Sequence, residues 1–131
     1  MNLNLLIKKV ITDMSRKKLS SKKIEALANE IRDWLIKNEM WVDTRIYFNN
    51  KAYTSLKHYN NPDNLIVIED INPKDYIDYC GDYLTMSFEG PLYDVLNYTN
   101  GKLKAEFDSI FDKYGLYYEL GNAWNLSVYE K

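Results

Sequence analysis

Hydrophobic residues near the start of the chain recur at helical spacing and predict two helices. The first covers residues 3–17. The second runs from an N-cap at Ser20-Ser21, where a hydroxyl can accept from free backbone N–H groups, to about Asn38. Each pattern has one apolar side, so we expect both helices to pack on the rest of the domain. The apolar stripe of the second helix is formed by Ile24, Leu27, Ala28, Ile31, Trp34 and Leu35.

After these helices the hydrophobic pattern changes to alternation, which is typical of strands. Residues 41–48 and 51–55 are two alternating runs. Asn49-Asn50 between them favours a tight hairpin turn, because asparagine tolerates positive φ. Leu65–Ile68 is apolar on both faces and is predicted to be a central strand.

The C-terminal half predicts the remaining strands. Residues 83–89 alternate like a strand that ends at Gly90-Pro91, and residues 115–129 form a hairpin with its turn at Gly121-Asn122. This part of the chain is the densest in aromatic and β-branched residues. We therefore expect it to form the centre of the sheet.

Three helical segments are predicted between and after these strands. A short helix opens at Asn72-Pro73 and closes at Gly81, where asparagine is the cap and proline the first helical residue. Residues 91–98 supply one or two turns, and residues 102–114 form a longer helix with a left-handed cap at the following glycine.

These elements together predict one α+β domain that covers residues 1–131. Two N-terminal helices pack on a mostly antiparallel sheet of about six strands, and a helix and a hairpin complete the C-terminal part. A chain of 131 residues with 46% apolar residues is long enough to bury a core without disulfides or metals. The strand order is not fixed by these patterns.

The net charge of −2 conceals a strong division between the halves of the chain. Residues 1–61 hold 12 basic and 6 acidic side chains, whereas residues 62–131 hold 5 basic and 13 acidic ones. Between Pro62 and Gly101, eight acidic residues are accompanied by Lys74 as the one base. Such a division indicates charged partners and says little about the fold.

The chain lacks the residues that most catalytic sites need. His58 is the one histidine and Cys80 the one cysteine, so neither a catalytic triad nor a cysteine-based zinc site can be assembled. The acidic residues show no metal-binding spacing, and there is no glycine-rich phosphate loop. We expect no catalytic residue, no metal and no cofactor.

Two candidate binding surfaces remain. The first is acidic and tyrosine-bearing, suited to the arginines and lysines of a basic protein partner. Its predicted contacts are Asp70, Asp75, Tyr76, Asp78, Tyr79, Asp82, Glu89 and Tyr93. The second is basic and would follow a phosphate backbone. Its candidate nucleic-acid contacts are Lys8, Lys9, Arg16, Lys17, Lys18, Lys22 and Lys23.

Two resemblances add to this interpretation. The runs Met86–Tyr98 (MSFEGPLYDVLNY) and Tyr114–Gly121 (YGLYYELG) resemble uncharacterised small proteins of Gram-positive phages and mobile elements, across about the last 50 residues. Size, charge division and composition are similar to type II anti-CRISPR inhibitors. The first resemblance has no known site to carry over, and the second implies a stoichiometric binder rather than an enzyme.

The predicted function is therefore that of a non-enzymatic inhibitor. It would block a nucleic-acid-handling defence enzyme, such as a Cas nuclease or its guide complex, through the acidic surface. The alternatives are an immunity protein or antitoxin, or a nucleic-acid-binding accessory protein that uses the basic helices. The sequence has no signal peptide and no apolar run near the roughly 20 residues of a membrane span, so we expect a cytoplasmic protein without membrane contact. The oligomeric state stays open.

Overall fold

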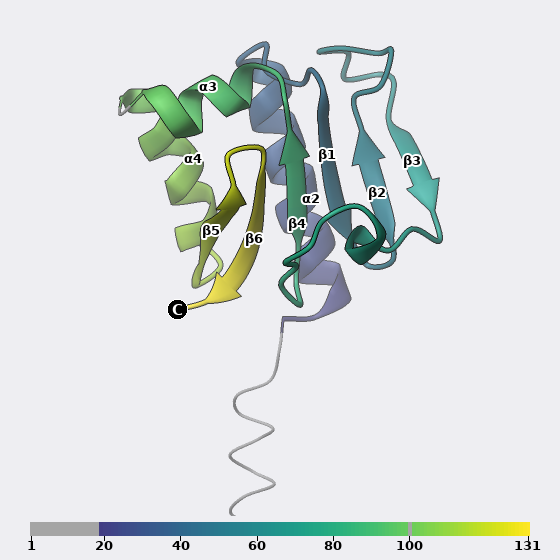
Figure 1. Cartoon of the computed structure of the whole chain (residues 1–131). Helices are drawn as coiled ribbons and strands as arrows, with labels where there is room; N and C mark the ends of the chain where they lie inside the picture. Colours follow the sequence, from purple (N-terminus) through teal and green to yellow (C-terminus); the bar gives the residue numbers. More distant parts are fainter. Residues whose placement is uncertain (1–18, 100) are drawn as a thin grey trace, which may run out of the picture.

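A computed structural model describes residues 19–99 and 101–131 of the chain (Figure 1). The elements are α2 (Ser21–Lys37), β1 (Thr44–Phe48), β2 (Lys51–Thr54), β3 (Ile66–Glu69), the 3₁₀ turn η1 (Pro73–Asp75), β4 (Thr85–Phe88), α3 (Pro91–Tyr98), α4 (Lys102–Asp112), β5 (Leu116–Asn122) and β6 (Asn125–Glu130). The predicted α+β class is confirmed. The predicted helix over residues 3–17 lies outside the described residues.

The six strands form one sheet in the order β3-β2-β1-β4-β6-β5, and every neighbouring pair is antiparallel. The helices cover one face: α2 packs on β1 and against α4, α3 packs on β4, and α4 packs on β5. Figure 1 shows α2 behind the sheet, while the segment with η1 crosses in front of it. We call the face away from the helices the outer face. None of the described helices combines the length and the apolar character needed to cross a membrane.

The main core lies between the helices and the sheet. Ile46 and Phe48 of β1 point into it, whereas Tyr47 points to the outer face and joins a second, smaller cluster. Alternation along the strand produces this division, because successive side chains point to opposite faces. Ile31 of α2 is fully buried, and Trp34 packs partly buried against the same core, as the apolar stripe predicts.

Local chemistry at the helix and hairpin ends agrees with the sequence. The Ser20 hydroxyl accepts from the Lys23 backbone N–H at 3.2 Å, which is the predicted N-cap of α2. Asn49 and Asn50 have φ of 47° and 60°, as a tight turn between β1 and β2 requires. Gly115, at φ 71°, ends the last helical turn before β5.

The position of β3 corrects one prediction. The apolar run around Ile66–Glu69 forms an edge strand, not a central one. Its apolar side chains on both faces have a different cause: Val67 packs on the main core, while Ile68 packs on the cluster beneath the segment that follows β3. The expected central position of the C-terminal strands holds for β4 and β6, whereas β5 is the other edge.

The last hairpin and the short helix also differ from prediction. The β5–β6 turn is Ala123-Trp124 and not Gly121-Asn122. Gly121 lies instead at a register shift, where a Cβ would overlap the Asn125 side chain. The helix predicted from Asn72 to Gly81 is reduced to the single turn η1, although the Asn72 side chain caps it as expected, accepting from the Lys74 N–H at 3.0 Å.

We expect Gly90→Ala to destabilise the fold by about 1–3 kcal/mol, the usual range for overpacking. A Cβ at this position would overlap the backbone carbonyl of Val42, which cannot move aside as a flexible side chain would. Urea unfolding measures the effect. Gly101→Ala is the matched control, because a Cβ there meets nothing within 4 Å. Equal stability of the two variants would contradict the close approach.

Candidate functional site

The crossover segment, residues 70–84, joins β3 to β4 across the outer face of the sheet. Ile71 and Ile77 are buried there in a cluster with Tyr47 and Ala52. Removing these apolar side chains from water stabilises the segment on the sheet. The two isoleucines thus explain why a stretch with little regular secondary structure has a defined position.

Backbone contacts fix the second half of the crossover segment. The Ser127 hydroxyl donates to the Tyr79 carbonyl at 3.3 Å. At Gly81 a Cβ would lie 2.8 Å from the Val128 carbonyl oxygen, a separation that real Cβ atoms essentially never show. Glycine therefore permits the segment to approach β6 closely.

While the isoleucines point inward, the charged and tyrosine side chains from Lys74 to Asp82 are exposed to solvent. Five of the predicted contact residues are exposed on the stretch that runs from the last residue of η1 to the residues before β4: Asp75, Tyr76, Asp78, Tyr79 and Asp82. We call these five residues the acidic tyrosine surface. Lys74 is also exposed here, so residues 74–82 carry three carboxylates and one ammonium.

The two tyrosines of this surface are held differently. The Tyr76 ring lies 6.2 Å from the Tyr47 ring at an interplanar angle of 25°, and the Arg45 guanidinium lies 5.8 Å from the Tyr76 ring centre. The Tyr76 side chain is 57% exposed, while Tyr79 is 76% exposed and has no ring contact with another described residue. Tyr76 is pre-oriented, which lowers the entropy lost when a partner covers it.

A cleft of about 570 Å³ opens beside Tyr76 on the outer face. Arg45, Tyr59 and Trp124 line it together with Tyr76, and the predicted residue Glu89 lies on its wall. Aromatic rings and charges of both signs allow it to receive a partner side chain. Sequence reasoning missed Arg45, Tyr59 and Trp124. Arg45 could have been predicted, because side chains alternate along β1 and Arg45 therefore lies on the same face as Tyr47.

A buried arginine positions the loop that carries Tyr59. Arg32 is 7% exposed, and its Nη2 donates to the Asn61 carbonyl at 3.3 Å. The Asn60 side chain accepts from the Trp41 backbone N–H at 2.8 Å. These bonds connect the loop to α2 and to the start of the sheet, and they thereby fix the position of Tyr59 at the wall of the cleft.

The remaining predicted residues of the acidic surface are more dispersed. Asp70 is exposed at the end of β3, where its φ of 53° turns the chain onto the outer face. Tyr93 lies half-buried on α3, in the helical layer, with its ring 5.9 Å from that of Tyr98. The structure therefore brings Glu89 to the cleft, but does not bring Tyr93 to the crossover segment.

The basic candidates are described only in part. Lys22 and Lys23 are exposed in the first turn of α2. Lys8, Lys9, Arg16, Lys17 and Lys18 lie outside the described residues. Because α2 covers the face opposite to the crossover segment, its two lysines and the acidic tyrosine surface belong to different layers of the domain.

His58 lies in an exposed loop, and the free Cys80 is half-buried in the crossover segment. His58 is exposed, and its Nδ1 lies 3.1 Å from the Asn64 side-chain nitrogen. The Cys80 thiol donates to the Ile77 carbonyl at 3.4 Å, and burial raises its pKa, which disfavours a nucleophilic thiolate. Within residues 19–99 and 101–131, no three His, Cys, Asp or Glu side chains are grouped as a metal site requires.

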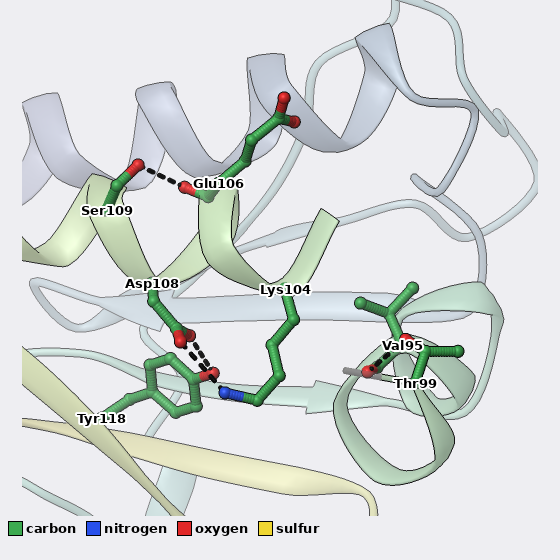
Figure 2. Close-up of polar contacts among 7 residues, drawn as sticks. All are labelled: Val95, Thr99, Lys104, Glu106, Asp108, Ser109 and Tyr118. Atoms are coloured by element: carbon green, nitrogen blue, oxygen red, sulfur yellow. Dashed lines mark hydrogen bonds and ion pairs between the residues drawn. The ribbon is translucent and has the colours of Figure 1, made fainter. Parts of the chain in front are cut away.

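One polar group joins α4 to β5. Tyr118 donates to Asp108, which also accepts from Lys104 at 3.0 Å (Figure 2). Burial and the Asp108 carboxylate raise the pKa of the Tyr118 hydroxyl, so it stays protonated and keeps this bond. The Tyr118 ring also packs on Phe107 and Phe111. The group therefore acts as a tie between the helix and the edge strand.

Comparison with known proteins gives no significant match to a family model, a curated protein or a solved structure.

Proposed function

We propose that the chain is a non-enzymatic protein-binding inhibitor whose contact surface is the acidic tyrosine surface with the adjoining cleft. The observation that carries the proposal is the crossover segment itself. Two buried isoleucines hold it on the outer face, and three carboxylates and two tyrosines are exposed from it. The partner is a basic protein surface, of the kind that nucleic-acid-handling enzymes use for phosphates.

Physical complementarity supports this type of partner. Arginine and lysine side chains that bind phosphates also bind carboxylates, often through paired charge-assisted hydrogen bonds. Tyrosine rings supply large contact area at little cost in side-chain entropy and are frequent among residues that dominate binding energy. A small acidic protein bound in such a groove would exclude the nucleic acid. With the compositional resemblance, this makes a CRISPR-Cas nuclease the first target to examine.

A pull-down followed by a cleavage assay tests the proposal. The immobilised full chain is mixed with bacterial lysate that contains a type II Cas nuclease, and retained proteins are identified by mass spectrometry. We expect a basic nucleic-acid-handling protein that elutes at raised salt, and we expect added chain to inhibit its activity at a stoichiometric ratio. Retention of a basic toxin would assign the same surface to an immunity protein. Retention of nucleic acid alone would contradict the proposal.

We expect Tyr79→Ala to weaken partner binding by about 2 kcal/mol or more, mainly through faster dissociation, because an exposed tyrosine ring becomes an anchor when a partner covers it. Surface plasmon resonance with the retained partner measures both rates. The matched control is Tyr98→Ala: Tyr98 on α3 is 74% exposed, against 76% for Tyr79, but lies in the helical layer. Equal losses in the two variants would place the contact elsewhere.

A further inference from the structure

The edge strand β5 has backbone groups that point away from the sheet. The Lys131 N–H donates to the Gly115 carbonyl, and the register pairs Tyr117 with Tyr129. Hydrogen-bonded and non-hydrogen-bonded pairs alternate along an antiparallel ladder, so residues 115, 117 and 119 bond to β6. The N–H and C=O groups of Leu116, Tyr118 and Leu120 consequently point to the open edge.

Contacts of β6 support this assignment. The Val128 N–H donates to the Leu84 carbonyl at 3.0 Å, in register with the β4–β6 pairing. Val128 lies opposite Tyr118 in the β5–β6 ladder. The backbone N–H and C=O of Val128 therefore point to β4 and do not bond to Tyr118. The backbone groups of Tyr118 point to the opposite side, where a further strand could pair with them.

A groove accompanies this edge. A cleft of about 490 Å³ lies between α4 and β5, and the side chains of Leu116, Tyr118 and Leu120 line it. Figure 1 shows α4 alongside β5 at this end of the sheet. Lys104 and Asp108 are paired with each other on the α4 wall, as Figure 2 shows. An apolar side chain that enters the groove therefore contacts leucine and aromatic carbon atoms, and the charged groups on the α4 wall remain paired with each other.

Few of the devices that protect edge strands are present on β5. The strand has seven residues and contains neither lysine nor proline, and Leu120 remains 40% exposed. Its one charged residue, Glu119, is exposed on the opposite face to the groove and makes no ion pair with another described residue. A strand added beside β5 would therefore meet a negative charge on the outer face and an apolar groove on the helical side.

We propose that β5 is a second interaction site, which binds an extended peptide segment of a protein partner as an antiparallel seventh strand. The segment alternates apolar residues, which enter the groove between α4 and β5, with basic residues, which face Glu119. Main-chain hydrogen bonds supply affinity and the groove supplies selectivity. The site is separate from the acidic tyrosine surface and does not depend on its role.

A synthetic peptide tests this geometry. The probe is a capped, fluorescently labelled peptide of seven residues, the length of β5, that alternates valine and lysine. In an antiparallel ladder, the valines whose side chains face the groove lie opposite Leu116, Tyr118 and Leu120. The N–H groups of these valines therefore point to β5, whereas the N–H groups of the lysines point away from it. We expect N-methylation of the valines to abolish binding to the full chain, measured by fluorescence anisotropy, and N-methylation of the lysines to preserve it.

Variants of the chain locate the site. We expect Leu120→Lys to weaken peptide binding by at least about tenfold, because an ammonium would occupy the groove. Leu65→Lys is the matched control beside the opposite edge, where Leu65 is 48% exposed. Amide hydrogen exchange at Tyr118 and Leu120 should slow with the peptide bound. Failure of the unmodified peptide to bind, or equal binding of the two methylated peptides, would overturn the proposal.

Discussion

Replacing Phe107 by alanine is expected to lower the free energy of unfolding by about 3–5 kcal/mol, the range for truncating a buried aromatic residue. Phe107 is fully buried on α4. Its ring centre lies 5.5 Å from that of Trp34, 5.0 Å from that of Phe111 and 5.3 Å from that of Tyr118. The substitution therefore removes a side chain shared by α2, α4 and β5, and none of these elements can collapse into the space alone.

Urea unfolding followed by circular dichroism measures this loss, provided that the slope against denaturant is unchanged. Tyr79→Ala is the surface control and should change stability by no more than about 0.5 kcal/mol. A loss below about 1 kcal/mol for Phe107→Ala would mean that α4 does not pack on β5 and α2 as described. It would also remove the wall of the groove beside β5.

Reversing Asp75, Asp78 and Asp82 to lysine is expected to reduce the association rate with the basic partner by at least about tenfold at low salt. Charges exposed on one segment steer an oppositely charged surface, so their reversal converts attraction into repulsion. The dissociation rate should change less, because tyrosines supply the close contact. The wild-type rate should fall as salt shortens the screening length from its value of roughly 10 Å at 0.1 M.

Two controls separate local from overall charge in this experiment. Reversal of Asp33, Asp63 and Asp94 makes the same change in net charge at exposed positions outside the crossover segment. Lys22→Glu with Lys23→Glu tests the described part of the basic surface, and acids are tolerated in the first turn of a helix. The outcome that would overturn our proposal is loss of binding in the Lys22→Glu, Lys23→Glu variant with binding retained in the Asp75, Asp78 and Asp82 reversal. The nucleic-acid-accessory alternative would then replace our proposal.

Features set by neighbouring residues could be predicted from the sequence. Asn49-Asn50 forms the β1–β2 turn because few residues other than asparagine and glycine adopt positive φ readily. The Ser20 cap and the stripe of α2 follow equally local rules. Each of these depends on side chains within one or two turns of the chain, where periodicity and capping chemistry are informative.

Features set by distant residues could not be predicted. The apolar character of Leu65–Ile68 indicates burial on both faces, but a strand covered by the crossover segment has the same pattern as a central strand. Gly121-Asn122 has favourable turn chemistry, yet the turn lies two residues further on, where the Asn122 side chain accepts from the Trp124 N–H at 3.0 Å. Tertiary packing decides between such alternatives.

The candidate site shows the same division. The acidic and aromatic character of residues 75–82 is visible in the sequence, whereas its display depends on Ile71 and Ile77 being buried on the sheet. Tyr93 shares that character but lies on α3, because helical periodicity turns it to the main core. Arg45, Tyr59 and Trp124 come from three separate segments and meet only in the folded chain.

Hydrogen exchange of the full chain, alone and with the partner retained from lysate, tests the central claim most directly. We predict that binding slows exchange of the backbone amides from Tyr76 to Asp82, which lie in the exposed crossover segment. Slower exchange confined to the first turn of α2, with residues 76–82 unchanged, would contradict the account and place the partner on the basic layer.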